Sequence, residues 1–580
     1  MNDAAFSPEQ QEYLKGFMAG VEARRGALRP AGDGGGGGGG GGGPPDALRA
    51  AQDATIARGG KLVAQEEAKR EKHPLDRWSE LTARAAEGKF PKPIDDFIGR
   101  YHGLFFVGPA QNAFMCRLRI PGGILAAHQL DAIADIAAEC AGGYADVTTR
   151  ANLQFREIPA DKGPVVVMRL GDIGLLPRGT GADNIRNLTA SPTAGIDAQE
   201  LMDTRPIIRA LHHHILHTRD LFALPRKFNI SVSGGGAVEV LQETNDIALS
   251  AVTTAAGLRF RLTLGGITGH RDFARPTGVV VAEADIIPVC DAILRVFIAE
   301  GDRTDRAKAR LKYVLDRMSM DAFLGLVEQR LGRPLERIAE ADIIAPPPPA
   351  KHGHVGVHAQ KQPGLTYIGV MGAVGRLTVA QLRGVADIAR RFGSGTIRLT
   401  VWQNLLISDV PEARVAPALD AIAALGLTHQ ASSIRGGLVA CTGNAGCKFA
   451  ASNTKRHAAE LSAFLEAHLA FAEPVNIHLT GCHHSCAQHY VADIGLLAAK
   501  VERGEDLVEG YDLHLGGGAG PEQKIGRLIR PKVAHDELGP VVLGVLRGWL
   551  DQRAPGESFH AFCAARDDAA LIALAGETTP

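Results

Sequence analysis

The sequence has little that would place the protein in a membrane or on a nucleic acid. No uninterrupted apolar run approaches the roughly 20 residues that a membrane-spanning helix needs. Residues 1–20 lack the basic start, apolar core and cleavage site of a secretory leader, so we expect a cytoplasmic protein. Lys and Arg total 63 against 64 Asp and Glu, a balance that gives no long-range attraction to nucleic acid or to an anionic membrane. Any cationic site must therefore be local.

A nucleotide-binding glycine fingerprint is also missing. The ten consecutive glycines at residues 34–43 match the dinucleotide pattern only formally, because no strand precedes them and no helix follows. With Pro44 and Pro45 they are typical of flexible coil, and we interpret residues 34–45 as a linker within an N-terminal extension over residues 1–75. Without a flavin or nicotinamide module, electrons for any redox chemistry would come from another protein.

The chain contains an internal repeat. Residues 125–159 match residues 377–411 without a gap, at a constant offset of 252. In each copy apolar residues keep helical spacing and then alternate along a β-type segment that ends at proline. A looser likeness follows, in which NIRNLTAS resembles SIRGGLVA and FNISVSG resembles VNIHLTG. These patterns indicate a duplicated α/β module, and a ligand between two such halves is a natural arrangement.

Four of the eight cysteines form two close pairs. They are Cys441-x5-Cys447 and Cys482-x3-Cys486, which can converge on one soft metal centre. Two pairs of buried cysteines or a structural zinc are the alternatives, although zinc usually takes tighter spacings within each pair. An iron–sulfur cluster is favoured, because four cysteine thiolates are its usual ligands. The other cysteines are scattered singly and predict core residues rather than disulfides, which a reducing compartment disfavours.

These cysteine motifs in a duplicated chain resemble the siroheme-containing nitrite and sulfite reductase family. The likeness runs from about Lys89 to about Leu550. It implies an α+β fold with two ferredoxin-like half-domains and two siroheme-binding α/β domains. The expected boundaries are 76–165 and 350–415 for the half-domains, and 166–345 and 416–580 for the larger domains, with an extended connector at Pro346–Pro349.

The resemblance also implies the cofactors and the ligands that hold them. In this family the four cysteines bind a [4Fe-4S] cluster, so the expected ligands are Cys441, Cys447, Cys482 and Cys486. The last cysteine of the set also ligates the siroheme iron, which makes Cys486 the expected shared thiolate. A shared thiolate gives electrons a covalent path between the two centres and leaves the opposite face of the iron open for substrate.

Basic motifs in the first half extend the resemblance. Siroheme carries several carboxylates and the substrate is an anion, so the site needs guanidinium and ammonium groups. The matching motifs are MCRLRIPGG, VTTRANLQFR, DNIRNLTAS, LPRKFN and GDRTDRAKARLKYVL. By resemblance, the residues that face the open iron position are Arg117, Arg186 and Lys227. Those expected to hold the macrocycle are Arg150, Gln154, Arg306 and Arg310. Together they would bind the anion, stabilise charge and relay protons.

The residue two positions after Lys227 favours nitrite over sulfite. Sulfite-reducing members of the family place a second lysine there and nitrite-reducing members an asparagine, and this chain has Asn229. A dianion gains from a further ammonium, whereas a monoanion can use a neutral donor. Lys448, directly after the second cluster cysteine, is a sulfite-type feature. We predict six-electron reduction of nitrite to ammonia in nitrate assimilation, with sulfite reduction to sulfide as the alternative.

Two other classes are weighed against this prediction. A relative that contracts the corrinoid ring in cobalamin biosynthesis need not keep an anion-binding lysine, so Lys227 counts against it. A plain iron–sulfur electron carrier would need the cysteines and not the basic residues. The family resemblance implies a small acidic ferredoxin as donor and a monomeric protein. His483 and His484 replace the family's Pro-Asn, and the spacing of His213 and His217 suits either a metal or a solvated helix face.

Overall fold

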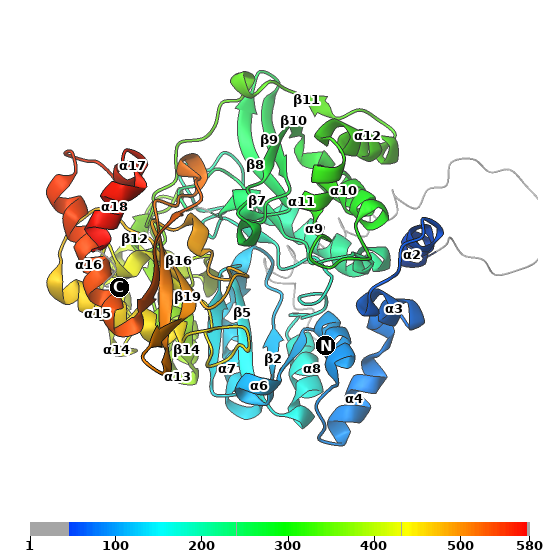
Figure 1. The fold of residues 1–580 in the computed structure, drawn as a ribbon, viewed down its shortest axis with the longest axis horizontal. Helices are drawn as coiled ribbons and strands as arrows, with labels where there is room; N and C mark the ends of the chain where they lie inside the picture. The colour runs from blue at the N-terminus through cyan, green and yellow to red at the C-terminus, as the bar shows by residue number, and fades with distance from the viewer. Residues whose placement is uncertain (1–45, 239, 431, 577–580) are drawn as a thin grey trace, which may run out of the picture.

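The structure is a computed structural model that describes residues 46–576 apart from Glu239 and Ala431. The predicted glycine-rich linker lies outside these residues. Within the described chain, no helix is both long enough and apolar enough to cross a bilayer. Mixed helices and sheets form four sheet-centred regions that share the internal duplication, which confirms the α+β fold (Figure 1).

Two five-stranded sheets carry the gapless repeat, and each takes its edge strand from the other copy. The first sheet has the order β1 (Leu104–Val107), β2 (Ala113–Arg117), β5 (Asn152–Ile158), β4 (Tyr144–Thr148) and β14 (Arg376–Thr378). The second has the order β12 (Gly356–Ala359), β13 (Leu365–Val370), β16 (Leu405–Pro411), β15 (Thr396–Leu399) and β3 (Ile124–Ala126). Tyr144 pairs with Thr378, and Thr396 pairs with Ala126, so the exchange obeys the same offset of the repeat.

The repeated helices α7 (Ala127–Cys140) and α13 (Val379–Phe392) pack in one core between these sheets. Their apolar stripes are buried, as the helical spacing predicts. The sequence predicted a single β-type segment after each helix, whereas the structure has two strands joined by a tight turn. The turn is hidden in the sequence pattern because its left-handed residue is not glycine: Ala151 has φ 46° and its counterpart Gln403 has φ 59°.

Two further sheets form the other domains, each with parallel strands followed by antiparallel strands. The first contains β6 (Thr189–Ala190), β7 (Ile230–Ser233), β8 (Ile247–Thr254), β9 (Gly257–Leu264), β10 (Arg275–Val281) and β11 (Glu336–Arg337). The second contains β17 (Leu438–Ala440), β18 (Ile477–Thr480), β19 (Ile494–Arg503), β20 (Asp506–Leu515) and β21 (Arg527–Ala534). Asn229 N donates to Asp246 Oδ2 at 2.8 Å and Asn476 N donates to Asp493 Oδ2 at 2.7 Å, which confirms the looser likeness between the halves.

Helices cover these sheets, and buried apolar residues of both helices and strands form the two cores (Figure 1). In the first half they are α9 (Arg205–His217), α10 (Ile286–Glu300), α11 (Leu311–Arg317) and α12 (Met320–Leu331). In the second half they are α15 (Thr454–His468), α16 (His535–Gln552), α17 (Phe559–Ala564) and α18 (Asp568–Ala575). The half-domains add α6 (Gly108–Gln111), α8 (Gly163–Asp172) and α14 (Val415–Ala424).

The described N-terminal helices pack against the first half. They are α2 (Ala47–Ala57), α3 (Ala64–Glu71), α4 (Trp78–Ala86) and α5 (Pro93–Gly99), drawn in blue in Figure 1. Leu48 and Ala51 of α2 belong to the same apolar cluster as α10 and the β7–β10 sheet. Burial of this kind contributes stability, so residues 46–71 form an integral layer of the fold.

Candidate cofactor and anion site

The four predicted cysteine ligands lie on two loops that leave the same edge of one sheet. β17 and β18 are parallel, so Cys441 and Cys482, which follow them, emerge side by side. Cys441 N donates to Leu479 O at 3.1 Å, and Gly481 N donates to Cys441 Sγ at 3.1 Å. A side chain at Gly481 would collide with Ala450, so the close approach of the two loops requires glycine there.

The thiols of these loops act electrostatically on one another. Burial and then the neighbouring Cys441 raise the pKa of the Cys486 thiol to about 11, while Cys447 and Cys441 add to the burial that raises the pKa of Cys482. All four are free thiols, and Cys486 alone among them is exposed. Cys486 is therefore accessible to solvent although protein atoms surround much of its side chain. The remaining cysteines, Cys116, Cys140, Cys290 and Cys563, are buried, which confirms their prediction as core residues.

Two of the three cations expected at the substrate position lie near Cys486, and the third, Arg186, lies near those two. Lys227 and Arg117 both lower the pKa of Cys486, so their charges lie near its sulfur. Burial and then Arg310 lower the pKa of Lys227 to about 7, and burial and then Arg117 hold the pKa of Arg186 well below its ordinary value. These half-buried side chains repel one another. Such a cluster is costly unless it binds anions.

The contacts of these cations within the described chain are few. Arg117 stacks over the Phe105 ring at 4.8 Å, and no hydrogen bond or ion pair is formed by its guanidinium with the described residues. Lys227 likewise has no carboxylate partner in this part of the chain. Arg186 donates to Thr180 O at 2.6 Å and to Ala182 O at 2.8 Å, which fixes its guanidinium without neutralising it. The positive charge of the cluster is therefore available to a ligand.

Arg150 and Gln154 lie beside this cluster on the first sheet. Gln154 of β5 is the cross-strand neighbour of Arg117 on β2. Arg150 follows β4, and its guanidinium donates to Asn245 Oδ1 at 3.1 and 3.2 Å and to Asn187 O at 3.1 Å. Its Nε is buried without a partner among the described residues. Burial lowers the pKa of Arg150 to about 10.

Arg306 and Arg310 have protein carboxylates as partners. Arg306 forms a two-pronged ion pair with the buried Asp183 at 2.7 and 2.8 Å. Arg310 does the same with the buried Asp246 at 2.7 and 3.2 Å. Their assignment to cofactor carboxylates therefore stays a prediction. The structure shows instead that they anchor two aspartates beside the Lys227 segment, because Asp246 also accepts Asn229 N.

Two further basic residues, which the motifs alone did not predict, border the site. Arg156 of β5 donates to Gly446 O at 2.9 Å and so holds the first cysteine loop. Arg226 lies 4.0 Å from Asp183 and acts on the pKa of Lys227. Both residues belong to the basic motifs VTTRANLQFR and LPRKFN that resemble the family. A motif with several basic residues does not by itself show which side chain faces the ligand.

His483 and His484, between Cys482 and Cys486, are exposed at the surface of the second cysteine loop. His484 meets the ring of Phe449 edge-on at 5.4 Å, and Phe449 in turn carries Lys448 at 5.2 Å over its face. Phe449 is 56 % exposed, unusually high for a phenylalanine. His213 and His217 lie on α9, where their rings stack at 6.2 Å. The helix confirms the expected secondary structure.

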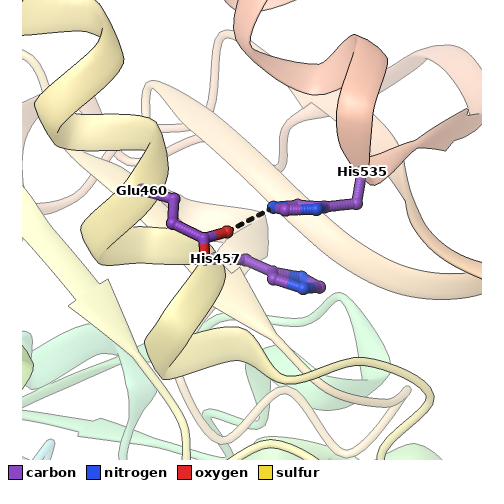
Figure 2. Close-up of side chains that lie close together, drawn as sticks. All are labelled: His457, Glu460 and His535. Atoms are coloured by element: carbon purple, nitrogen blue, oxygen red, sulfur yellow. Dashed lines mark ion pairs between the residues drawn. The ribbon is translucent and has the colours of Figure 1, made fainter.

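A second group of potential metal ligands lies on α15 and at the start of α16. His457, Glu460 and His535 have ligand atoms within 4.8 Å of one another (Figure 2). Figure 2 shows the two imidazole rings stacked face to face, with centroids 3.5 Å apart, and His535 paired with Glu460. The Arg456 guanidinium donates to Glu460 at 3.0 Å and to His457 at 2.9 Å. Stacked rings do not converge on one ion, and an arginine already satisfies the carboxylate.

Comparisons with known proteins decide the family. The model described as "Nitrite and sulphite reductase 4Fe-4S domain" matches residues 181–335 and 432–558, and the "Nitrite/Sulfite reductase ferredoxin-like half domain" matches residues 108–173 and 358–425. The chain belongs to the nitrite and sulphite reductase family. Its cofactors are accordingly a [4Fe-4S] cluster and siroheme.

Individual relatives of this nitrite and sulphite reductase family member span most of its length. A ferredoxin–nitrite reductase from Leptolyngbya laminosa is 38% identical over 503 residues, which cover 85% of this chain and 98% of the relative. A "Sulfite reductase [ferredoxin] 1" from Mycolicibacterium paratuberculosis is 34% identical, covering 79% and 83%. The solved structure of Mycobacterium tuberculosis NirA protein superposes with a TM-score of 0.82 at 31% identity, covering 89% and 99%.

The residues present fit both cofactors. Four free thiols on two loops at one sheet edge suit a cubane cluster. The neighbouring cations have more positive charge than nearby carboxylates neutralise, and Arg150 Nε is a buried donor without a described partner. A tetrapyrrole with several carboxylates supplies the missing negative charge.

Proposed function

We propose that this protein reduces nitrite to ammonium with electrons from a ferredoxin. The observation that carries the proposal is the arrangement of Lys227 and Arg117 around Cys486, the exposed member of the cysteine set. In this proposal the four cysteines would hold the cluster, and Cys486 would also hold the siroheme. The two cofactors would pass electrons one at a time from the donor protein to the bound anion.

The protein's own residues would bind the anion and deliver protons. Reduction of nitrite to ammonium and two waters consumes six electrons and eight protons. Arg117 and Arg186 stay charged and would attract the anion and stabilise charge on its oxygens. Burial and neighbouring cations place the pKa of Lys227 near 7, so its Nζ can be both a cation that binds and an acid that releases a proton.

The choice of nitrite over sulfite rests on Asn229. The side chain of Phe228 is buried in the core, so the half-buried Lys227 and Asn229 lie on the opposite side of this extended segment. An amide at this position adds no charge beside Lys227. Lys448, the sulfite-type feature, is exposed and packs on Phe449 instead of joining the cation cluster. Its position therefore does not support sulfite.

A side-by-side assay tests the proposal. Purified holoenzyme is supplied with nitrite or sulfite and with an artificial one-electron donor, and ammonium or sulfide is measured as product. We expect ammonium to form with the larger kcat/KM. Reduction of neither anion by protein with full cluster and siroheme would contradict the proposal. Preferential formation of sulfide would transfer the assignment to sulfite reduction, for which the 34% identical sulfite reductase is a precedent.

A further inference from the structure

Helix α3 (Ala64–Glu71) carries two charged residues that are almost completely buried. Glu66 and Lys69 are 1% and 2% exposed. Neither matched family model reaches this helix, since the matched residues begin at 108. Charged side chains are seldom buried unless they are paired, and their burial here needs a reason.

Lys69 reaches two loops of the first half. Its Nζ donates to Leu224 O at 3.1 Å and lies 3.5 Å from Asp183 Oδ2, while Glu66 on the same helix accepts from it. Glu66 also accepts from Arg303 at 2.8 Å, and Arg303 donates to Ala223 O at 2.8 Å. The backbone before Lys227 is thus held at two successive carbonyls, one by Lys69 of α3 and the other by Arg303, which is itself paired with Glu66 of α3.

The two loops that Lys69 joins are the loops that carry the anion-site cations. Asp183 precedes Arg186 by three residues, and Leu224 precedes Lys227 by three. The loops are paired directly, because Phe228 N donates to Asn184 O at 3.0 Å and Arg186 N donates to Phe228 O at 2.8 Å. A movement of one loop is therefore passed to the other.

Asp183 is the centre of this network. Burial alone would raise its pKa, but Lys69 and then Arg306 outweigh burial and hold the pKa below its ordinary value. Arg306 and Arg226 approach the same carboxylate from the side of the anion site, at 2.7 and 4.0 Å. Loss of the Lys69 charge would leave Asp183 to be satisfied by these two arginines alone and would leave Leu224 O without its donor.

We propose that Lys69 is a positioning residue for the anion site, which sets Lys227 and Arg186 in place from a helix outside the family's matched domains. The inference rests on the proposed function, in which these two cations bind the substrate. Displacement of a binding charge by about 1 Å is enough to change affinity and rate by one to two orders of magnitude. Lys69 itself contacts no substrate.

The test compares the binding of a charged and a neutral ligand to the holoenzyme. Nitrite affinity is measured by optical titration of the oxidised protein, and carbon monoxide affinity is measured on the reduced protein. Nitrite needs the cations, whereas carbon monoxide is neutral. The variants are Lys69→Met, the conservative Lys69→Arg and the matched control Lys72→Met, whose exposed side chain pairs with Glu80 near the same helix. If Lys69→Met does not fold, Glu66→Gln combined with Lys69→Met removes one buried charge of each sign together.

We expect Lys69→Met to weaken nitrite binding about tenfold while carbon monoxide binding and siroheme content stay within about twofold of wild type. Lys69→Arg should recover part of the loss, and Lys72→Met should behave as wild type. Unchanged nitrite affinity in Lys69→Met, or in the double variant, would overturn the proposal. Equal loss of both ligands would also overturn it, because it would indicate general damage to the cofactor site. Failure of wild-type protein to bind or reduce nitrite would instead refute the proposed function.

Discussion

Substitution of Asn229 by lysine should shift the enzyme from nitrite toward sulfite. The backbone around this residue is fixed, since Asn229 N donates to Asp246 Oδ2 and Ile247 N donates to Asn229 O at 3.1 Å. The side chain does not take part in these bonds. A longer side chain can therefore extend on the same side as Lys227 without disturbing these backbone hydrogen bonds.

The expected size of the shift follows from Coulomb's law. Residues two apart on an extended chain are about 7 Å apart, so the new ammonium repels Lys227 by about 2 kcal/mol at an effective dielectric of about 20. A monoanion at about 4 Å gains about 4 kcal/mol from the added charge, and a dianion gains about twice that. The difference of about 4 kcal/mol is an upper value, because water and the cofactor carboxylates screen it. We expect at least about 1.4 kcal/mol, a tenfold shift in relative kcat/KM.

The assay compares nitrite and sulfite at mildly alkaline pH, where sulfite is mainly a dianion. Wild type, Asn229→Lys and the uncharged control Asn229→Leu are assayed with the same artificial donor and at matched siroheme content. Wild type should prefer nitrite by at least about tenfold, and only the lysine variant should move the ratio toward sulfite. A wild type that prefers sulfite, with a ratio that Asn229→Lys leaves unchanged, would refute both the substrate assignment and the charge argument.

Three further predictions address the cluster, the electron donor and acid stability. Cys486→Ser should abolish most turnover and lower siroheme content, and a variant with full cofactors and wild-type turnover would show that another residue is the shared ligand. Phe449→Ala and Lys448→Ala should slow the ferredoxin-dependent reaction several-fold and leave the viologen-dependent reaction unchanged. The reason is that an exposed aromatic ring and a cation beside the cysteine loops suit an acidic donor protein. Equal slowing with both donors would show that these residues do not bind the donor protein. Burial holds the pKa of His102 at about 4 and that of His354 at about 3, below the ordinary value of 6.5, so their stability contribution is complete above about pH 6.5 and is lost as the pH falls toward 4. At pH 5.5 each histidine should lower the free energy of unfolding by about 1.4 kcal/mol, which would be measured as a lower urea midpoint. His102→Gln should make the midpoint depend less on pH. A wild-type midpoint that does not change with pH would contradict this prediction.

The sequence predicts those features whose partners lie nearby along the chain or repeat at a fixed offset. The two cysteines of each pair are separated by only a few residues, and each repeated helix has its own apolar stripe. Contacts between distant charges leave no such pattern. Lys69 and Asp183 are 114 residues apart, and nothing in the motif around Arg306 tells that its guanidinium pairs with Asp183. The exchanged edge strands β3 and β14 are hidden for the same reason, because each pairs with the other copy.

The site itself breaks the symmetry of the duplication. Arg186 and Lys227 precede the strands β6 and β7, whereas Cys441 and Cys482 follow the corresponding strands β17 and β18, so opposite sheet edges of the two halves supply the cations and the thiols.

The counterparts of these residues in the repeat are paired within the protein and so cannot form a second site. Arg435, the counterpart of Arg186 in the repeat, is exposed and pairs with Glu466. The loops after β6 and β7, which correspond to the cysteine loops, close on Asp197, whose carboxylate accepts from Thr193 Oγ1 and from Ala237 N, both at 2.7 Å. In the internal repeat these positions align as equals. Their different chemistry is visible only from the contacts. One member of each pair is hydrogen-bonded or ion-paired within the protein, and the other is left open to a ligand. The cations of the first half are therefore complementary to the cysteines of the second.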